Sequence, residues 1–175
     1  MKKLQTLLSE EQIRDRIAEL AEQITTDYKG KQPVLVAVLK GSFLFFSDLI
    51  RKIDLPLEVD FLGASSYGNK TVSSGVVRIT LDLSYPISGR DVILVEDIVD
   101  TGNTLHYILE GLRLRNPASL KVCTLLLKPE CIQKKVPVSY IGFKIPNKFV
   151  VGFGLDAAEK YRNLPYIAIL PGEHE

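Results

Sequence analysis

Residues 34–39 form an unbroken apolar run, Val-Leu-Val-Ala-Val-Leu, with the length of one β-strand. Because the side chains of a strand alternate between the two faces of its sheet, an entirely apolar strand needs cover on both faces. Such strands are typical of the centre of a parallel sheet. Similar runs lie at 91–95 and 120–127, and helical patterns separate them. The sequence therefore predicts an α/β domain with a mostly parallel sheet flanked by helices.

Other elements follow from local patterns. Residues 9–12, Ser-Glu-Glu-Gln, read as a capping box, and apolar residues then recur at positions 13, 17, 20 and 24. This spacing predicts a helix that ends near Gly30. Two more helices are expected, one over 42–53 and one with apolar positions 105, 108, 109 and 112. Further strands are expected over 57–62, 76–83, 138–145, 149–153 and 166–170. Residues 64–75 are rich in Ser, Gly and Asn, and a loop of this length in a compact domain indicates either a lid or a disordered tip.

Length, charge and cysteine content narrow the class of protein. A chain of 175 residues is expected to form one domain, and its net charge of +1 gives no overall footprint for nucleic acid or an anionic membrane. Residues 111–150 hold eight Lys and Arg against one Glu. The two cysteines, Cys123 and Cys131, cannot build a disulfide framework, and no apolar stretch approaches a membrane span. We therefore expect a soluble, cytoplasmic protein.

The most informative segment runs from the strand at 91–95 into the next helix. The strand is followed by Glu96 and Asp97, and residues 101–104, Thr-Gly-Asn-Thr, begin the helix. In open α/β sheets ligands bind at the carboxyl ends of strands, and a helix N-terminus there suits a phosphate. The two carboxylates would then bind ribose hydroxyls or magnesium. The alternative is that Asp100 or Thr101 is only an N-cap, after a solvated strand end.

The stretch 95–104, Val-Glu-Asp-Ile-Val-Asp-Thr-Gly-Asn-Thr, resembles the phosphoribosyl-diphosphate signature of the type I phosphoribosyltransferases. Further stretches resemble the hypoxanthine(-guanine) phosphoribosyltransferases in the right order: 39–41, 66–69, 127–129, 148–152 running to 155–156, and 161–165. The resemblance covers about residues 7 to 170. It implies a type I phosphoribosyltransferase fold in a single domain, residues 1–175. A flexible lid (64–75) and a small purine-binding hood (145–170) belong to that fold.

The implied activity is a purine-salvage reaction. A magnesium-dependent enzyme would transfer the 5-phosphoribosyl group from phosphoribosyl diphosphate to N9 of hypoxanthine or guanine, giving IMP or GMP and pyrophosphate. The resemblance makes Asp100 the catalytic acid/base at purine N7. It assigns phosphoribosyl diphosphate or nucleotide binding to Lys40, Gly41, Glu96, Asp97, Thr101, Gly102, Asn103, Thr104 and Arg162. In this family the peptide bond corresponding to Leu39–Lys40 is commonly cis.

The resemblance also supplies the base and metal contacts. Lys128 would donate to the 6-oxo group, Phe149 would stack on the purine, and Val150 would present its backbone to the opposite edge of the base. Ser66 and Tyr67 would lie on the lid. Magnesium would be held by Glu96, Asp97 and Asp156.

Each of these residues also has a plain structural interpretation. Alone, Phe149 could be core, Lys128 an exposed strand end, and Arg162 a surface ion pair with Glu159. A xanthine-preferring relative is the alternative enzyme, and a nucleotide-sensing regulator that binds DNA or RNA is the alternative from another class. The family commonly forms homodimers and homotetramers, so one of these assemblies is expected.

Overall fold

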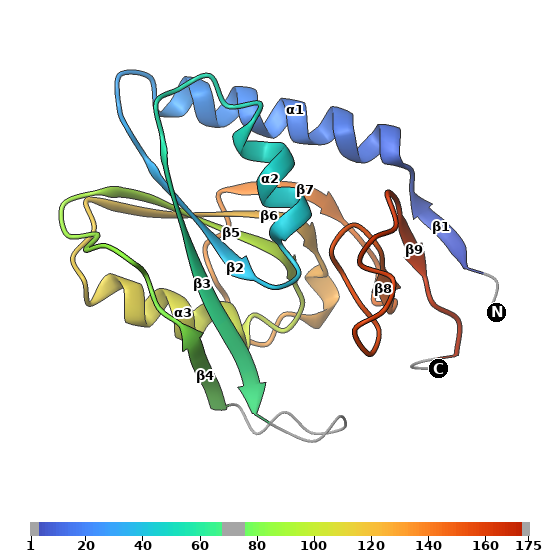
Figure 1. Ribbon diagram of the computed structural model, residues 1–175. Helices are drawn as coiled ribbons and strands as arrows, with labels where there is room; N and C mark the ends of the chain where they lie inside the picture. Colours follow the sequence, from blue (N-terminus) through green and yellow to red (C-terminus); the bar gives the residue numbers. More distant parts are fainter. Residues whose placement is uncertain (1–3, 68–75, 173–175) are drawn as a thin grey trace.

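A six-stranded sheet in the order β4-β3-β2-β5-β6-β7 forms the centre of the computed structural model, which describes residues 4–67 and 76–172 (Figure 1). All neighbouring strands are parallel except β3 and β4, which form an antiparallel pair at one edge. The strands are β2 (Val34–Leu39), β3 (Glu58–Tyr67), β4 (Val76–Leu81), β5 (Asp91–Val99), β6 (Ser119–Leu127) and β7 (Tyr140–Lys144). The mostly parallel sheet predicted from the sequence is confirmed.

Two hydrophobic cores lie on opposite faces of this sheet. Odd-numbered residues of the central strands, such as Leu35, Ala37 and Ile93, pack with α1 (Glu10–Asp27) and α2 (Phe43–Ile50). Even-numbered residues, such as Val36 and Leu94, pack with α3 (Asn103–Arg113). Figure 1 shows α1 and α2 above the sheet and α3 below it. The apolar character of β2 on both faces is thereby explained.

The helices begin where the sequence indicates. Ser9 caps α1 with a complete capping box, because its Oγ accepts from the amide of Gln12 at 3.2 Å and its amide donates to Gln12 Oε1 at 2.8 Å. Helix α3 begins after Gly102, which has a φ of 82° and makes no side-chain cap. The N-cap position therefore belongs to Gly102 and not to Asp100 or Thr101, although Thr101 Oγ1 accepts from the amide of Asn103.

A second, three-stranded sheet has the order β1-β9-β8 and lies at one end of the central sheet (Figure 1). Its strands are β1 (Gln5–Leu8), β8 (Val150–Val151) and β9 (Ile167–Ile169), all antiparallel to their neighbours. It brings the two ends of the described chain together.

Several boundaries differ from the sequence prediction, and strand β1 was not predicted. Strand β5 continues past residue 95 to Val99, because Ile98 and Val99 still pair with Leu126 and Leu127 of β6. Residues 64–67, assigned above to the lid loop, belong to β3 and pair with β4. Helix α2 ends at Ile50 rather than residue 53. The remainder of the predicted lid, 68–75, lies outside the described residues. Within 4–67 and 76–172, no helix is both long and apolar enough to cross a bilayer.

Candidate active site

The site lies at the carboxyl ends of β2 and β5, the two central strands. From β2 the chain leads on to β3 on one side, and from β5 it leads to β6 and β7 on the other. Such a reversal of strand order leaves a crevice outside the carboxyl ends of the strands, where α/β proteins bind ligands. The loop after β2 begins with a cis peptide bond between Leu39 and Lys40. Ser42 anchors this loop by donating its hydroxyl to the carbonyl of Val38 at 2.6 Å.

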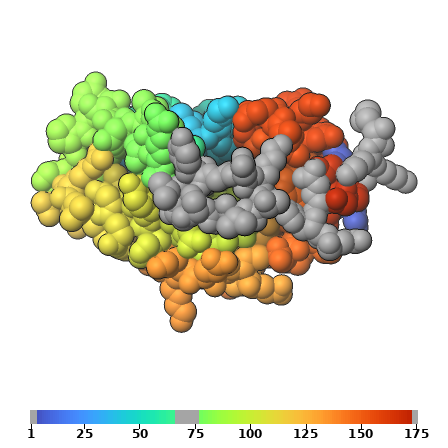
Figure 2. All heavy atoms as spheres, turned by 90° about the horizontal axis from the view of Figure 1, so that it is seen from below, coloured from blue at the N-terminus to red at the C-terminus, as the bar shows by residue number. Residues whose placement is uncertain are grey.

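A cleft of about 770 Å³ occupies this position. Its walls come from five separate parts of the chain: the end of β2 with the loop after it, the β3–β4 pair, the end of β5, the first turn of α3 and the segment before β9. Figure 2 shows the molecule from below. In this view the early part of the chain, in blue, lies between the middle part, in green, and the late part, in orange-red. The predicted site residues that line the cleft are Lys40, Gly41, Glu96, Asp97, Thr104, Asp156 and Arg162.

Glu96 and Asp97 form an acidic pair within β5 and not a solvated strand end. Glu96 is only 8% exposed, and its Oε1 accepts from the amide of Asp97 at 3.2 Å. Asp97 Oδ1 accepts from the amide of Ile98 at 2.7 Å. Burial, together with repulsion by Asp97, raises the pKa of Glu96 well above its ordinary value, and burial also raises the pKa of Asp97. Two adjacent carboxylates at the wall of the cleft, one buried and the other partly exposed, are suited to binding a cation or hydroxyl groups.

Gly41 makes room for this pair. A methyl group added to its Cα would lie 1.6 Å from Asp97 Oδ2, which is far inside any allowed contact. The loop after β2 therefore approaches β5 closely only because residue 41 has no side chain. Gly154, at a φ of 97°, makes a similar approach from the other side, since a methyl group there would lie 2.0 Å from the carbonyl oxygen of Gly41.

Beside the cleft lies a smaller cavity of about 90 Å³ at the N-terminus of α3. Asp100, Thr101, Gly102 and Thr104 line it, and Glu96 and Thr104 line both spaces. The amide of Asn103 donates to Thr101 Oγ1 at 3.3 Å, and the first amides of α3 have no intrahelical partner by geometry. A phosphate fits such a helix terminus.

A second loop holds this turn in place. The amides of Gln133 and Lys134 both donate to the carbonyl of Thr101, at 2.9 and 3.1 Å. The Asn103 side chain donates to Gln133 Oε1 at 3.3 Å. Asn103 therefore points toward this loop.

Lys128 and Asp100 form an ion pair next to the small cavity. Lys128 Nζ lies 3.1 Å from Asp100 Oδ2; the lysine side chain is 7% exposed and the carboxylate 48%. The interpretation of Lys128 as an exposed strand end is therefore wrong. A lysine is rarely buried unless it is paired, so its position requires a partner of the kind Asp100 provides.

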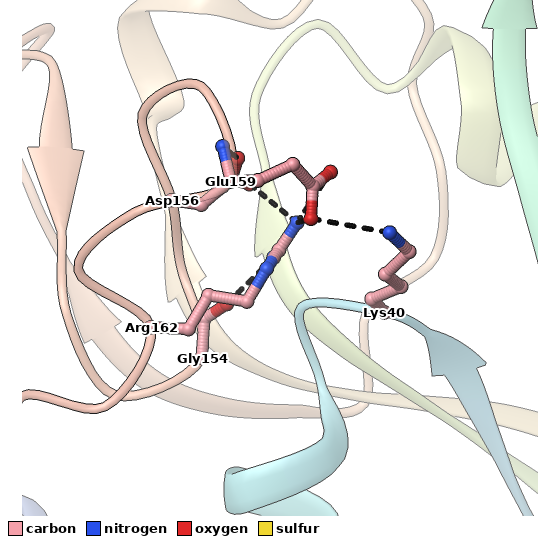
Figure 3. A network of polar contacts seen from close by, with 5 residues as sticks. All are labelled: Lys40, Gly154, Asp156, Glu159 and Arg162. Atoms are coloured by element: carbon pink, nitrogen blue, oxygen red, sulfur yellow. Dashed lines mark hydrogen bonds and ion pairs between the residues drawn. The ribbon is translucent and has the colours of Figure 1, made fainter.

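A network of charges closes the far side of the cleft (Figure 3). Arg162 donates to the carbonyl of Gly154 at 2.8 Å and pairs with Asp156 Oδ1 at 2.8 Å. Glu159 lies 3.4 Å from Arg162 and 3.1 Å from Lys40 Nζ. The ion pair between Arg162 and Glu159 suggested from the sequence is present, and it belongs to a larger network that reaches Lys40.

Phe149 and Val150 are not among the residues that line these two cavities. Phe149 is half-buried, and Val150 is buried in β8. Ser66 and Tyr67 are the last two residues of β3 and pair with Val77 and Val76 of β4. Their roles toward a ligand stay predictions. Ser65 and Thr80 also line the cleft, but Ser65 was predicted only as part of the segment 64–75, and Thr80 was not predicted as a site residue. Glu159 was predicted only as a partner of Arg162.

The carboxylates of the cleft are possible ligands for magnesium. Among residues 4–67 and 76–172, no three His, Cys, Asp or Glu side chains gather as a metal-binding group. Magnesium is usually held by one or two carboxylates, with waters and substrate phosphates as the remaining ligands. The pair Glu96 and Asp97 fits that pattern. Asp156 uses one oxygen for Arg162 and the other for the amide of Glu159, at 2.8 Å each.

Comparison with known proteins relates the whole chain to one family. The phosphoribosyl transferase domain matches residues 4–158. The hypoxanthine-guanine phosphoribosyltransferase of Mycobacterium tuberculosis is 53% identical over 170 residues, which cover 94% of this chain and 84% of that protein. The crystal structure of a hypoxanthine-guanine phosphoribosyltransferase from Bacillus anthracis superposes with a TM-score of 0.91 at 48% identity, over 96% of this chain and 99% of that one.

Some relatives are much longer. The bifunctional protein TilS/HprT of Listeria monocytogenes is 49% identical over 167 residues, which are 95% of this chain and 26% of that protein. The chain thus spans about a quarter of the length of these bifunctional relatives.

Proposed function

The chain belongs to the phosphoribosyl transferase domain family, and we propose that it is a hypoxanthine(-guanine) phosphoribosyltransferase. It would transfer the 5-phosphoribosyl group of phosphoribosyl diphosphate to N9 of hypoxanthine or guanine, with IMP or GMP and pyrophosphate as products. The observation that carries the proposal is the placement of Asp100. This carboxylate lines the small cavity at the start of α3 and also pairs with the buried Lys128.

The two adjoining cavities separate the parts of the substrate. The 5′-phosphate binds at residues 101–104, where Gly102 allows close approach and the free amides of α3 donate. The ribose hydroxyls bind Glu96 and Asp97, which accept hydrogen bonds. The diphosphate lies on the far side of the cleft, against Lys40 and Arg162.

Charge development in the reaction matches this arrangement. As the bond from ribose C1′ to the diphosphate breaks, positive charge grows on the sugar and negative charge on the leaving group. Arg162, held by Gly154 and Asp156, and Lys40 stabilise the negative charge. Asp100 accepts the proton from purine N7 as N9 bonds to C1′.

Lys128 selects the base. Its ammonium has only N–H donors, so it binds the 6-oxo group of hypoxanthine or guanine. The 6-amino group of adenine would face the ammonium donor to donor, leaving buried polar groups unpaired. Phe149 stacks on the purine, and the backbone of Val150 contacts the opposite edge.

Magnesium is the cofactor in this proposal, and Glu96 and Asp97 would hold it. Asp156 would hold a second ion through the lone pairs that its contacts with Arg162 and the Glu159 amide leave free. When bound, it supplies positive charge that neutralises the diphosphate. The raised pKa values of Glu96 and Asp97 support this role, because a buried carboxylate pair needs a compensating cation to remain charged.

The proposal extends to organisation and setting. Residues 1–175 are one domain, and residues 145–170 supply the hood over the purine. Ser66 and Tyr67, at the end of β3, would lie over the reacting centre. The protein works in the cytoplasm as a homodimer or homotetramer on small-molecule substrates. The two cysteines, neither bonded to the other, are compatible with a reducing compartment.

The experiment measures nucleotide formation from phosphoribosyl diphosphate with hypoxanthine, guanine, xanthine or adenine, with magnesium and with excess EDTA. We expect turnover of hypoxanthine or guanine that EDTA abolishes, and none with adenine. Asp100→Asn should lose about 100- to 10,000-fold in rate, as expected for loss of general acid–base catalysis. The control is Asp48→Asn, the same chemical change at an exposed carboxylate that pairs with Arg51. Adenine turnover, or full activity of Asp100→Asn, would contradict the proposal.

A further inference from the structure

Glu159 places a carboxylate between the two cations on the far side of the cleft (Figure 3). Its Oε2 lies 3.1 Å from Lys40 Nζ, and its Oε1 lies 3.4 Å from Arg162 Nη2. Lys40 and Glu159 are 119 residues apart in the sequence, so this contact exists only because the fold joins the loop after β2 to the segment before β9. The Glu159 side chain is 67% exposed, and a solvent-exposed glutamate is ionised at neutral pH.

The two cations depend on Glu159 to different degrees. Arg162 has two closer partners, the carbonyl of Gly154 and Asp156 Oδ1, both at 2.8 Å. Its side chain is 20% exposed. Lys40 is 70% exposed, and within the described part of the chain Glu159 is the ion-pair partner found for its ammonium. Loss of the Glu159 carboxylate would leave Arg162 in place and release Lys40.

A tight turn holds Glu159 in this position. Ala157 and Lys160 exchange two backbone hydrogen bonds of 3.1 Å, and the residues between them, Ala158 and Glu159, have φ values of 50° and 64°. Positive φ at both central residues is the pattern of a type I′ turn, which favours Asn and Gly. The Glu159 amide also donates to Asp156 Oδ2 at 2.8 Å. The backbone of Glu159 is therefore fixed, while its carboxylate, 67% exposed, is free to turn into solvent.

We propose that Glu159 is a built-in competitor for the diphosphate subsite: its carboxylate occupies Lys40 and Arg162 in the free enzyme and leaves when a diphosphate binds. This inference rests on the proposed function, which places the diphosphate against the same two cations. A bound diphosphate and the Glu159 carboxylate are both anions, and they need the same donors. Glu159 thus weakens binding of phosphoribosyl diphosphate and of the product pyrophosphate, and it favours product release.

The opposite role would be that Glu159 orients Arg162 for binding. The distances argue against it, because Gly154 and Asp156 already fix the guanidinium at shorter range than Glu159 does. The two roles predict opposite signs for one substitution, Glu159→Gln, which retains the shape of the side chain and removes its charge.

The test compares wild type, Glu159→Gln and Glu110→Gln by calorimetric titration with pyrophosphate in the presence of magnesium. Glu110→Gln makes the same change in net charge at an exposed residue of α3 that pairs with Arg113. We expect Glu159→Gln to bind pyrophosphate about two- to fivefold more tightly, a modest gain because exposed ion pairs are weak. The gain should shrink as salt is raised. Glu110→Gln should match wild type.

Steady-state kinetics provide a second readout. Glu159→Gln should lower KM for phosphoribosyl diphosphate by a similar factor and leave the affinity for IMP, which has no diphosphate, unchanged. Weaker pyrophosphate binding by Glu159→Gln, or an equal change in Glu110→Gln, would overturn the inference. If wild type itself neither binds pyrophosphate nor turns over a 6-oxopurine, the proposed function fails instead. If wild type does both and Glu159→Gln is unchanged, only the role of Glu159 is refuted.

Discussion

Gly41→Ala separates the architecture of the cleft from the stability of the fold. Gly41 does not have a positive φ, so alanine meets no backbone penalty at this position. The new methyl group, however, would lie 1.6 Å from Asp97 Oδ2 and 2.7 Å from its Cγ. Both atoms belong to the end of a side chain that can rotate, so the clash is relieved by moving the carboxylate and not the backbone.

The size of that movement sets the expected loss of activity. An ordinary van der Waals separation is about 3.5 Å, so Asp97 Oδ2 must retreat by roughly 2 Å. A displacement of about 1 Å in a catalytic arrangement can cost 100-fold in rate, so we expect kcat/KM to fall by at least about 100-fold. We expect the free energy of unfolding to change by about 1 kcal/mol or less. A change of that size moves the midpoint of thermal unfolding by only a few degrees.

Gly111→Ala is the matched control. Gly111 lies in α3, and a methyl group there would have no atom within 4 Å. Alanine in a helix interior is more stable than glycine by about 0.5–1 kcal/mol, so this variant should melt slightly higher and retain full activity. The assay is nucleotide formation with saturating magnesium, beside thermal unfolding followed by circular dichroism. Near-normal activity of Gly41→Ala, or a loss of activity that only follows unfolding, would refute the reasoning.

Three further outcomes are expected. Lys128→Met should lower kcat/KM for hypoxanthine by at least about 100-fold. The free energy of unfolding should change little, because the half-exposed Asp100 stays solvated. A retained preference for 6-oxopurines over adenine in this variant would refute the role of Lys128. Tyr140→Phe removes the hydroxyl that donates to Asp27 at 2.6 Å and should cost about 1 kcal/mol in urea unfolding at pH 7 without affecting activity. That hydrogen bond lowers the pKa of Asp27, so the extra stabilisation of the ionised carboxylate is present above pH 4 and should weaken as the pH falls through the lowered value. A difference between the two proteins that does not decrease on acidification would contradict this. Burial raises the pKa of the Cys123 thiol, so a thiol reagent should modify Cys131 in the native protein and Cys123 only after denaturation, as mass mapping would show.

Much of the central sheet could be predicted because apolar runs in the local sequence indicate its strands. Val34–Leu39 is apolar at every position, and the structure covers it on both faces. The end of β5 was harder to predict. Glu96 and Asp97 interrupt the apolar run, yet the strand continues to Val99 through pairing with β6, which no local pattern reports.

The strands at the edges depend on distant partners. Residues 64–67 contain two serines and read as loop, but pairing with β4 makes them the end of β3. Strand β1 has only four residues and forms against β9, more than 150 residues later in the chain. Such short strands have little preference of their own, and their partner determines them.

In the candidate site, too, features that are continuous in sequence could be predicted, whereas contacts between distant segments could not. Residues 95–104 were recognisable because strand end, turn and helix start are continuous in sequence. The pair of Lys128 with Asp100 and the contact of Glu159 with Lys40 join separate segments, so only the fold reveals them. The close approach of Gly41 to Asp97 likewise requires coordinates.

The central claim is that the small cavity at the start of α3 binds the 5′-phosphate and that Lys128, next to this cavity, recognises the base. A crystal structure with GMP and magnesium tests it most directly. We predict the phosphate among the amides of residues 101–104 and the 6-oxo oxygen within hydrogen-bonding distance of Lys128 Nζ, with Asp100 beside purine N7. A nucleotide bound elsewhere, or bound with its base away from Lys128, would contradict the account.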